Sequence, residues 1–173
     1  MMTQPTSMVT PLQRIRRHHA LEHATLHVLT RMNPYQSLMG YSDAGGFWIV
    51  GNVSPEMLRE AVEEALTRLK NGEGQLAIHP NCGTNFAVAG ILAGTAAWLS
   101  TAFNRDEDHR RIDNLPGMAV AATLAIILAQ PLGFLLQRRV TTDCRPGAMR
   151  VVEIKIYQTR LTQIQRVILQ HTS

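Results

Sequence analysis

The chain has 173 residues, of which 45% are apolar, and a formal net charge of +4 from 17 basic and 13 acidic side chains. This length suits one domain with a sizeable core, or a small domain joined to a membrane element. The two cysteines are too few for the disulfide framework of a small secreted domain. The basic residues, nearly all arginine, lie mainly beside long apolar runs, which favours a lipid bilayer over nucleic acid as the partner.

The first predicted element is a helix. Thr10, Pro11 and Gln13 supply a capping side chain, a proline in the first turn and a reciprocal cap. We expect this helix to end near Arg31, before the Asn-Pro pair at 33–34. The polar residues before it lack the apolar stretch of a cleavable signal peptide, so we expect the chain to begin in the cytoplasm.

This helix carries the stretch HHALEHATLHVL, in which His19 and His23 are one turn apart and share a face. His27 continues the row one turn later, and Glu22 lies beside it. Two imidazoles at this spacing can hold Zn²⁺, and a neighbouring carboxylate can take a proton from a water molecule. The sequence therefore predicts His19 and His23 as zinc ligands and Glu22 as a general base.

The alternative is an amphipathic helix lying on a bilayer surface, with its histidines as polar filler. Three apolar side chains share the histidine face, which favours an inward-facing row: Ile15, Leu26 and Leu29. In either case, we expect His18 and His27 to lie at the surface or to contact the metal ligands without binding the metal.

Residues 45–53 predict a strand, and Ser54-Pro55 predicts the start of a second helix that ends at Asn71-Gly72. Residues 75–79 are expected to form another strand, which would complete a βαβ-like unit. The stretch HPNCGTN then places His79 and Cys82 just before a long apolar run. It is either a turn into a helix, part of the zinc site, or a nucleophilic cysteine with a histidine base.

Two uncharged runs, 86–103 and 118–136, are each just long enough to cross a bilayer. The alternative is a pair of buried helices in a soluble bundle. Gly90 and Gly94 on the first run should pack against a ridge of alanines on the second, at 121, 125 and 129. Gln130 is expected to donate a hydrogen bond to the neighbouring helix.

After the second run, TTDC contains Cys144, and residues 149–157 and 165–171 predict two more strands. A membrane hairpin returns the chain to the side it left, so Cys82, Cys144 and His79 should meet at one interface. Thiolate and neutral imidazole are ligands that zinc prefers. A disulfide between the two cysteines is the alternative, which the reducing cytoplasm disfavours.

The predicted fold class is α+β. Residues 1–85 and 138–173 should form a small cytoplasmic domain, interrupted by a transmembrane helical hairpin at 86–137. Arginines flank the hairpin on the side of both termini, although the connector at 104–114 also carries three. Because basic residues collect on the cytoplasmic side, we expect both termini inside a bacterial inner membrane.

With these stretches in place, most of residues 14–158 resembles a family of small bacterial membrane proteins known as a domain of unknown function. This resemblance implies the layout of the chain, but it does not imply any particular activity. Separately, His19–His23 matches the H-x-x-E-H pattern of inverzincin metallopeptidases. That resemblance implies two histidine ligands and a glutamate base, while the third ligand of those enzymes, a later glutamate, has no counterpart here.

Two functions follow from these observations. The first is a membrane-anchored zinc protein with hydrolase or peptidase character, with ligands drawn from His19, His23, His79, Cys82 and Cys144. The second is a non-enzymatic membrane subunit or assembly factor with a closed Cys/His site, working with a membrane-protein or peptide partner. Four protein ligands would close the site, whereas three leave a position open for chemistry.

Overall fold

The computed structural model describes residues 9–102, 114–159 and 162–171, and the chain divides into two compact units. Unit 1 comprises Met1–His79 and Arg138–Ser173, and unit 2 comprises Pro80–Gln137. The described residues form four α-helices and one four-stranded antiparallel sheet, an α+β architecture. The predicted connector at 104–114 lies outside the described residues except for its last position.

The two helices of unit 1 begin where the sequence predicts. Helix α1 spans Pro11–Met32, and the reciprocal cap between Thr10 and Gln13 is formed in both directions, at 3.0 and 3.3 Å. Helix α2 spans Pro55–Lys70, and the Ser54 hydroxyl accepts a hydrogen bond from the first turn. These caps satisfy backbone N–H groups that have no partner inside the helix, so short local patterns fix both starting points.

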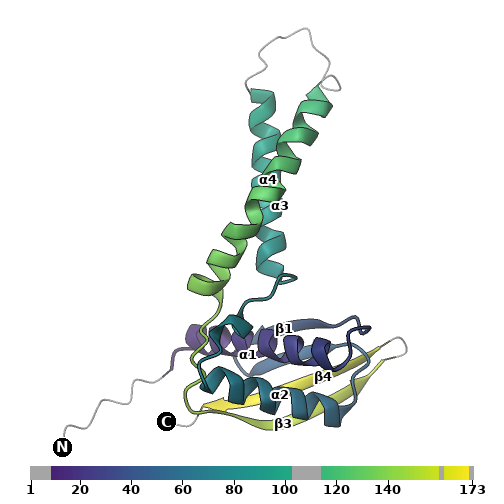
Figure 1. Ribbon diagram of the computed structural model, residues 1–173, viewed down its shortest axis with the longest axis vertical. Helices are drawn as coiled ribbons and strands as arrows, with labels where there is room; N and C mark the ends of the chain where they lie inside the picture. Colours follow the sequence, from purple (N-terminus) through teal and green to yellow (C-terminus); the bar gives the residue numbers. More distant parts are fainter. Residues whose placement is uncertain (1–8, 103–113, 160–161, 172–173) are drawn as a thin grey trace, which may run out of the picture. The chain divides into compact units, whose positions relative to one another are not determined.

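The sheet of unit 1 has the strand order β1-β2-β4-β3, and every neighbouring pair is antiparallel. Its strands, visible in Figure 1, are β1 (Met39–Asp43), β2 (Gly46–Val50), β3 (Met149–Gln158) and β4 (Gln163–His171). Strands β2, β3 and β4 confirm the strands expected from the sequence. Strand β1, which forms a tight hairpin with β2, was missed.

The predicted strand at 75–79 is wrong. Residues Gly74–Ala77 form a short 3₁₀ helix, η1. The carbonyl oxygens of Ala77 and Ile78 accept hydrogen bonds from side chains of α1, so this segment pairs with a helix and not with the sheet. The expected βαβ-like unit is therefore also wrong, because strand pairing is antiparallel throughout.

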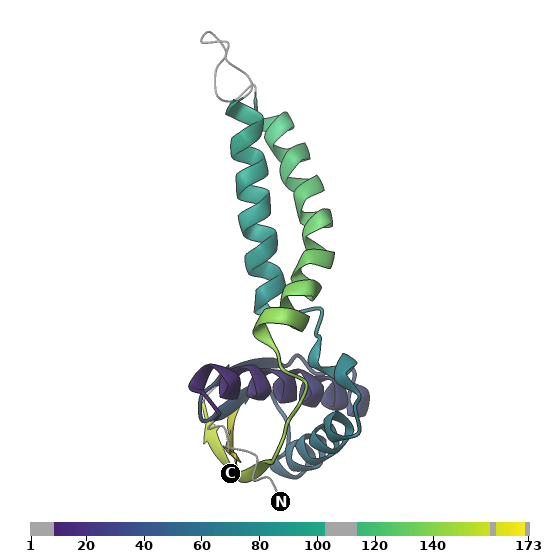
Figure 2. The same ribbon diagram turned by 90° about the vertical axis from the view of Figure 1, so that its left-hand side faces the viewer.

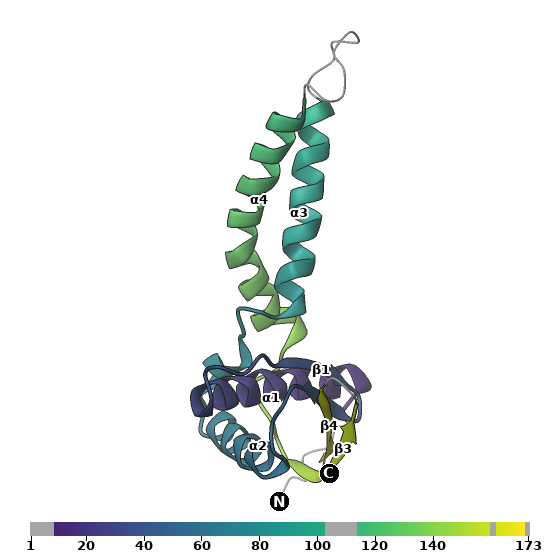
Figure 3. The ribbon, with the colours of Figure 1, turned by 90° about the vertical axis from the view of Figure 1, so that its right-hand side faces the viewer.

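Helices α1 and α2 lie on one face of the sheet (Figure 3), and the core of unit 1 fills the space between these layers. Alternate residues of each strand point to this face. Gly40 and Ser42 of β1 pair with Ile49 and Phe47 of β2 and so face the helices too. The fully buried side chains of this core include Leu21, Leu29, Phe47, Ile49, Leu58, Met149 and Val167.

The opposite face of the sheet carries a polar network centred on Asp43. The guanidinium of Arg166 forms two hydrogen bonds to the Asp43 carboxylate and lies 4.5 Å from the ring centroid of Trp48. The indole N–H of Trp48 also donates to this carboxylate, at 3.3 Å. The Arg166 hydrogen bonds are the main cause that lowers the pKa of Asp43 to about 2.

Replacing Arg166 with glutamine should return the pKa of Asp43 most of the way to its usual value near 4. The folded state is stabilised by this lowered pKa above about pH 4 and loses that contribution as the pH falls toward 2. A carboxyl chemical-shift titration by NMR measures the change. The control is Lys155→Gln, which removes the positive charge that lies opposite Arg166 on the neighbouring strand β3. An unchanged Asp43 pKa in the Arg166 variant would contradict this account.

Unit 2 is a helical hairpin of α3 (Gly83–Ala102) and α4 (Leu115–Leu136), which run side by side (Figure 2). Both are long and apolar enough to cross a membrane on length and composition. Many of their large apolar side chains are exposed, including Phe86, Ile91, Trp98, Leu124, Ile127 and Leu128. The chain then passes through a π-helical turn at Gln137–Thr141 back into unit 1.

The contact between α3 and α4 differs from the one expected. A Cβ added at Gly90 or Gly94 would meet nothing within 4 Å, so these glycines do not face α4. Gln130 is exposed on α4, and the amide that joins the helices is that of Gln137, which donates to Asn85 at 2.7 Å. Gly133 makes room for that asparagine, because a Cβ there would overlap its side chain.

Candidate metal centre

Four imidazoles of unit 1 lie in one row, here called the imidazole cluster: His19, His23, His27 and His79. The ring centroids of His19 and His23 are 4.3 Å apart, as expected for side chains one turn apart on α1. The ring of His79, which follows η1, lies 5.6 Å from that of His23 and 4.8 Å from that of His27. The fold therefore brings His79 to the histidine face of α1 from more than fifty residues away.

Backbone carbonyls fix the orientation of the first two rings. The Nδ1 of His19 lies 3.1 Å from the carbonyl oxygen of Thr141, and the Nδ1 of His23 lies 2.7 Å from that of Ala77. A carbonyl oxygen can only accept, so each Nδ1 carries the proton and each Nε2 keeps its lone pair. Metal-binding histidines are typically held by such a bond on the nitrogen that faces away from the metal.

The ligand nitrogens of His19 and His23 lie within 4.8 Å of one another. Two nitrogens bound to one zinc ion lie less than about 4.2 Å apart, because Zn–N bonds are about 2.0–2.1 Å long. His23 is buried, and the other three rings of the imidazole cluster are partly buried. Burial is the main cause that lowers the pKa of His79 to about 4, followed by the neighbouring His27 and His23. This ring is therefore neutral at pH 7, the form that binds metals.

Glu22 points away from this row toward β1. Its carboxylate accepts a hydrogen bond of 2.5 Å from the hydroxyl of Ser42, and it fills the space that a Cβ at Gly40 would occupy. Burial raises the pKa of Glu22, against the opposing effects of the Ser42 hydrogen bond and the charge of His19. The H-x-x-E-H pattern thus places a buried carboxyl behind the imidazoles, between α1 and the sheet.

The two cysteines are free thiols, so the disulfide alternative does not apply. Cys82 belongs to unit 2, where its sulfur accepts a hydrogen bond from the backbone N–H of Thr84 at 3.4 Å. Cys144 belongs to unit 1 and is exposed. Its sulfur lies 3.1 Å from the position of a Cβ on Gly74, in a depression of about 380 Å³ that none of the four imidazoles lines. Its role as a ligand stays a prediction.

His18 belongs to a different pair. Its Nδ1 donates to the carbonyl oxygen of Asp43 at 2.7 Å, so its Nε2 accepts a hydrogen bond from His171 at 2.9 Å. Burial is the main cause that lowers the pKa of both rings, to about 4 for His171. This neutral pair joins α1 to the end of β4 and explains the fourth histidine of the helix without a metal.

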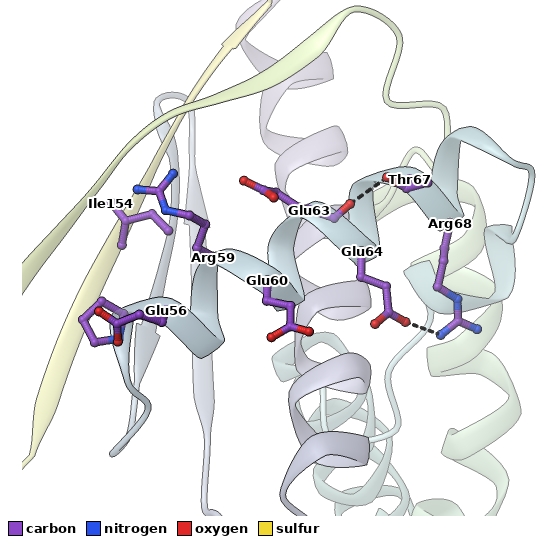
Figure 4. A pocket seen from close by; sticks show the side chains of 9 residues that line it. Glu56, Arg59, Glu60, Glu63, Glu64, Thr67, Arg68 and Ile154 are labelled. Carbon is purple, nitrogen blue, oxygen red and sulfur yellow. Dashed lines mark hydrogen bonds and ion pairs between the residues drawn. The ribbon is translucent and has the colours of Figure 1, made fainter.

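A depression of about 670 Å³ lies along α2 (Figure 4). Most of its lining residues are charged, and two of them pair with residues outside the lining: Arg68 bonds to Glu73 at 2.6 Å, and Glu64 bonds to Arg31 at the same distance. These side chains are exposed or partly exposed, so the pairs contribute little to stability. The lining residues include none of the predicted site residues: Pro55, Glu56, Arg59, Glu60, Glu63, Glu64, Thr67, Arg68 and Ile154.

Sequence reasoning found His19, His23 and His79 but missed the groups that orient them. The carbonyls of Thr141, Ala77 and Ile78 carry no signal in the sequence, since every residue has one. Gly40 and Ser42 were missed together with β1. The repeat of histidine at 19, 23 and 27 also predicts that His27 continues the row, and the structure confirms this.

Comparison with known proteins places this layout in a wider group. The family model described as "Domain of unknown function (DUF6391)" matches residues 14–154. An uncharacterized protein of Picosynechococcus sp. (strain PCC 7002) is 40% identical over 141 residues, covering 74% of this chain and 65% of the relative. The chain thus spans somewhat less than two thirds of that relative's length. No solved structure matches.

Proposed function

The chain belongs to the DUF6391 family, whose description assigns no activity. From the imidazole cluster, we propose that the protein binds zinc and is anchored in a membrane. His19, His23 and Cys82 are a possible set of ligands. The observation that carries the proposal is the pair of hydrogen bonds from the Nδ1 atoms of His19 and His23 to backbone carbonyls. In each ring the unprotonated Nε2 is then the nitrogen that can bind a metal.

Cys82 is proposed as the third ligand because only a short segment of chain separates it from the imidazole cluster. It follows His79 by three residues, and three residues span at most about 10 Å. The backbone just before His79 is fixed to α1 at Ala77 and Ile78. Wherever unit 2 lies, the thiolate therefore starts within reach of the imidazole cluster. Two imidazoles and one thiolate form a donor set that suits zinc.

Three protein ligands leave one coordination position open, which favours a metal-dependent hydrolase over a closed structural site. A peptidase, which hydrolyses amide bonds, is one such enzyme. Bound zinc would supply Lewis acidity to such a site. Glu22 is proposed as the group that takes a proton from the attacking water, a role that requires its carboxyl, bonded to Ser42 in this structure, to turn toward the imidazoles when the metal binds. The substrate is a membrane-protein or peptide partner in this proposal.

The second candidate is a closed structural site without activity. His79 is close enough to the ring of His23 to enter the coordination shell as a fourth ligand, and Cys144 is the other candidate. Such a site would hold together the two segments that flank the hairpin, as in a membrane subunit or assembly factor. The number of protein ligands separates the two functions.

The membrane arrangement is part of the same proposal. Helices α3 and α4 would cross a bacterial inner membrane, with both termini in the cytoplasm. Arg138, Arg139, Arg145 and Arg150 follow α4, and basic residues next to a span favour the cytoplasmic side. The exposed apolar side chains of both helices would then face lipid.

Metal analysis of the full chain purified in detergent tests the proposal. We expect about one zinc ion per chain, and its loss in both His23→Ala and Cys82→Ser. His171→Ala, which removes a histidine outside the imidazole cluster, should keep its zinc. Circular dichroism verifies that each variant is folded. Zinc retained in a folded His23 variant would remove α1 from the site, and a wild-type chain that binds no zinc would overturn the proposal.

A further inference from the structure

The segment that leads to Cys82 is held to α1 by two consecutive carbonyls. His23 binds the carbonyl of Ala77 through Nδ1, at 2.7 Å, and His27 binds that of Ile78 through Nε2, at 2.8 Å. The ring of His27 also lies 4.8 Å from that of His79, the next residue along the chain. Two successive turns of α1 therefore hold two successive residues of the segment that leads to Cys82.

His27 differs from the two proposed ligands in the nitrogen that it uses. His19 and His23 bond to carbonyls through Nδ1, which leaves the outer Nε2 for a metal. The Nε2 of His27 bonds to the carbonyl oxygen of Ile78, and its Nδ1 lies nearer its own helix. Although its spacing matches that of His19 and His23, its ring is not oriented as a ligand of the same ion.

We propose that His27 is a positioning residue, which holds residues 78–82 so that the Cys82 thiolate reaches the metal. This inference rests on the proposed zinc site. The bond to His23 fixes Ala77, and the backbone N–H of Ile78 bonds back to Gln75, but neither of these bonds holds the carbonyl group of Ile78. The bond from His27, one residue later, fixes the direction in which the chain leaves α1. Ordering the loop in advance lowers the entropy lost when the thiolate binds.

A positioning role predicts a specific loss in His27→Ala. The two imidazole ligands remain, so the variant should still bind Co²⁺, used as a spectroscopic substitute for zinc. Its affinity should fall by about 10- to 100-fold, the range found when groups that orient metal ligands are removed. The thiolate-to-cobalt charge-transfer band should weaken by more than half, because Cys82 is bound for a smaller fraction of the time.

His27→Gln is the matched variant, since its side-chain amide can donate to the same carbonyl. We expect it to restore most of the band and of the affinity. Cys82→Ser provides the spectrum without a thiolate, and thermal unfolding followed by circular dichroism reports on the fold. A role confined to folding would lower the unfolding temperature and weaken the d–d bands of bound Co²⁺ and the thiolate band equally, which would overturn the proposal.

The two proposals fail in different ways. If the wild-type chain binds Co²⁺ with a thiolate band and His27→Ala keeps both unchanged, only the role of His27 is overturned. A thiolate band equally weak in His27→Ala and His27→Gln also overturns it, because the donated hydrogen bond is then not the cause. If the wild-type chain binds no Co²⁺, the zinc site and the role of His27 are both wrong.

Discussion

Glu22→Gln should keep the metal and lose hydrolysis. The amide has the shape of the carboxyl but cannot accept a proton from water, and removal of a general base lowers a rate by about 10²- to 10⁴-fold. The possible metal ligands are His19, His23 and Cys82, and Glu22 is not one of them. The zinc content of the Glu22→Gln variant should therefore equal that of the wild type. Hydrolysis of p-nitrophenyl acetate, an activated ester that needs no specific pocket, provides the rate.

Glu64→Gln, which removes a partly exposed carboxylate of α2, is the control and should hydrolyse the ester at the wild-type rate. Wild-type activity in a Glu22→Gln variant that retains zinc would exclude Glu22 as the base. A wild-type chain that hydrolyses the ester no faster than its zinc-free form would instead favour the closed structural site, and a count of four protein ligands by X-ray absorption would establish it.

The second large effect is expected at Gly40. A methyl group there would overlap the Glu22 carboxylate, and the neighbouring Ser42 hydroxyl already holds that carboxylate in place. Overpacking of a buried site costs about 1–3 kcal/mol, so Gly40→Ala should destabilise unit 1 by that amount. Because Glu22 must also move, hydrolysis should fall in the same variant. Guanidinium unfolding in detergent, followed by circular dichroism, measures the stability.

The cause can be isolated by a double-mutant cycle with Glu22→Ala. With the carboxylate removed, the methyl group at Gly40 has room, and its cost should largely disappear. Gly90→Ala, at a position where a Cβ meets nothing within 4 Å, is the control and should not destabilise the protein. An equal cost of Gly40→Ala in both backgrounds would show that backbone conformation, and not contact with Glu22, is responsible.

The helices of unit 1 could be predicted because their signals are local. Thr10 and Ser54 cap α1 and α2 within three residues of the groups that they bind. Strand β1 has no comparable signal, since the segment MGYSD contains few residues with high strand propensity. It is a strand because a two-residue turn pairs it with β2 and because α1 packs against it. Tertiary contacts decide its conformation.

The candidate site divides in the same way. The spacing of His19 and His23 follows from helix geometry and needs no knowledge of the fold. The position of Glu22 could not be predicted, because the same spacing allows it to face the ligands or the sheet. Its direction is set by Gly40 and Ser42, which lie on the strand that the sequence did not reveal.

In the hairpin, composition predicted the elements and only part of their contact, since Ala129 of the expected alanine ridge is buried. Glycines spaced four residues apart suggested the helix interface, yet Gly90 and Gly94 face away from α4. The two helices are instead joined near their connection to unit 1 by Asn85 and Gln137, with Gly133 beside them. Interhelical bonding between polar side chains depends on rotation of each helix about its axis, which an apolar run leaves undetermined.

The placement of the three tethered carbonyls has a mechanical consequence. The chain leaves unit 1 just after Ala77 and Ile78 and re-enters it just before Thr141, and all three are bonded to imidazoles of α1. Tension on either connection to the hairpin is therefore transmitted to the same helix, at positions one or two turns apart. An ion shared by His19 and His23 would resist that tension on both connections at once, so movement of the helical hairpin and metal occupancy should affect each other.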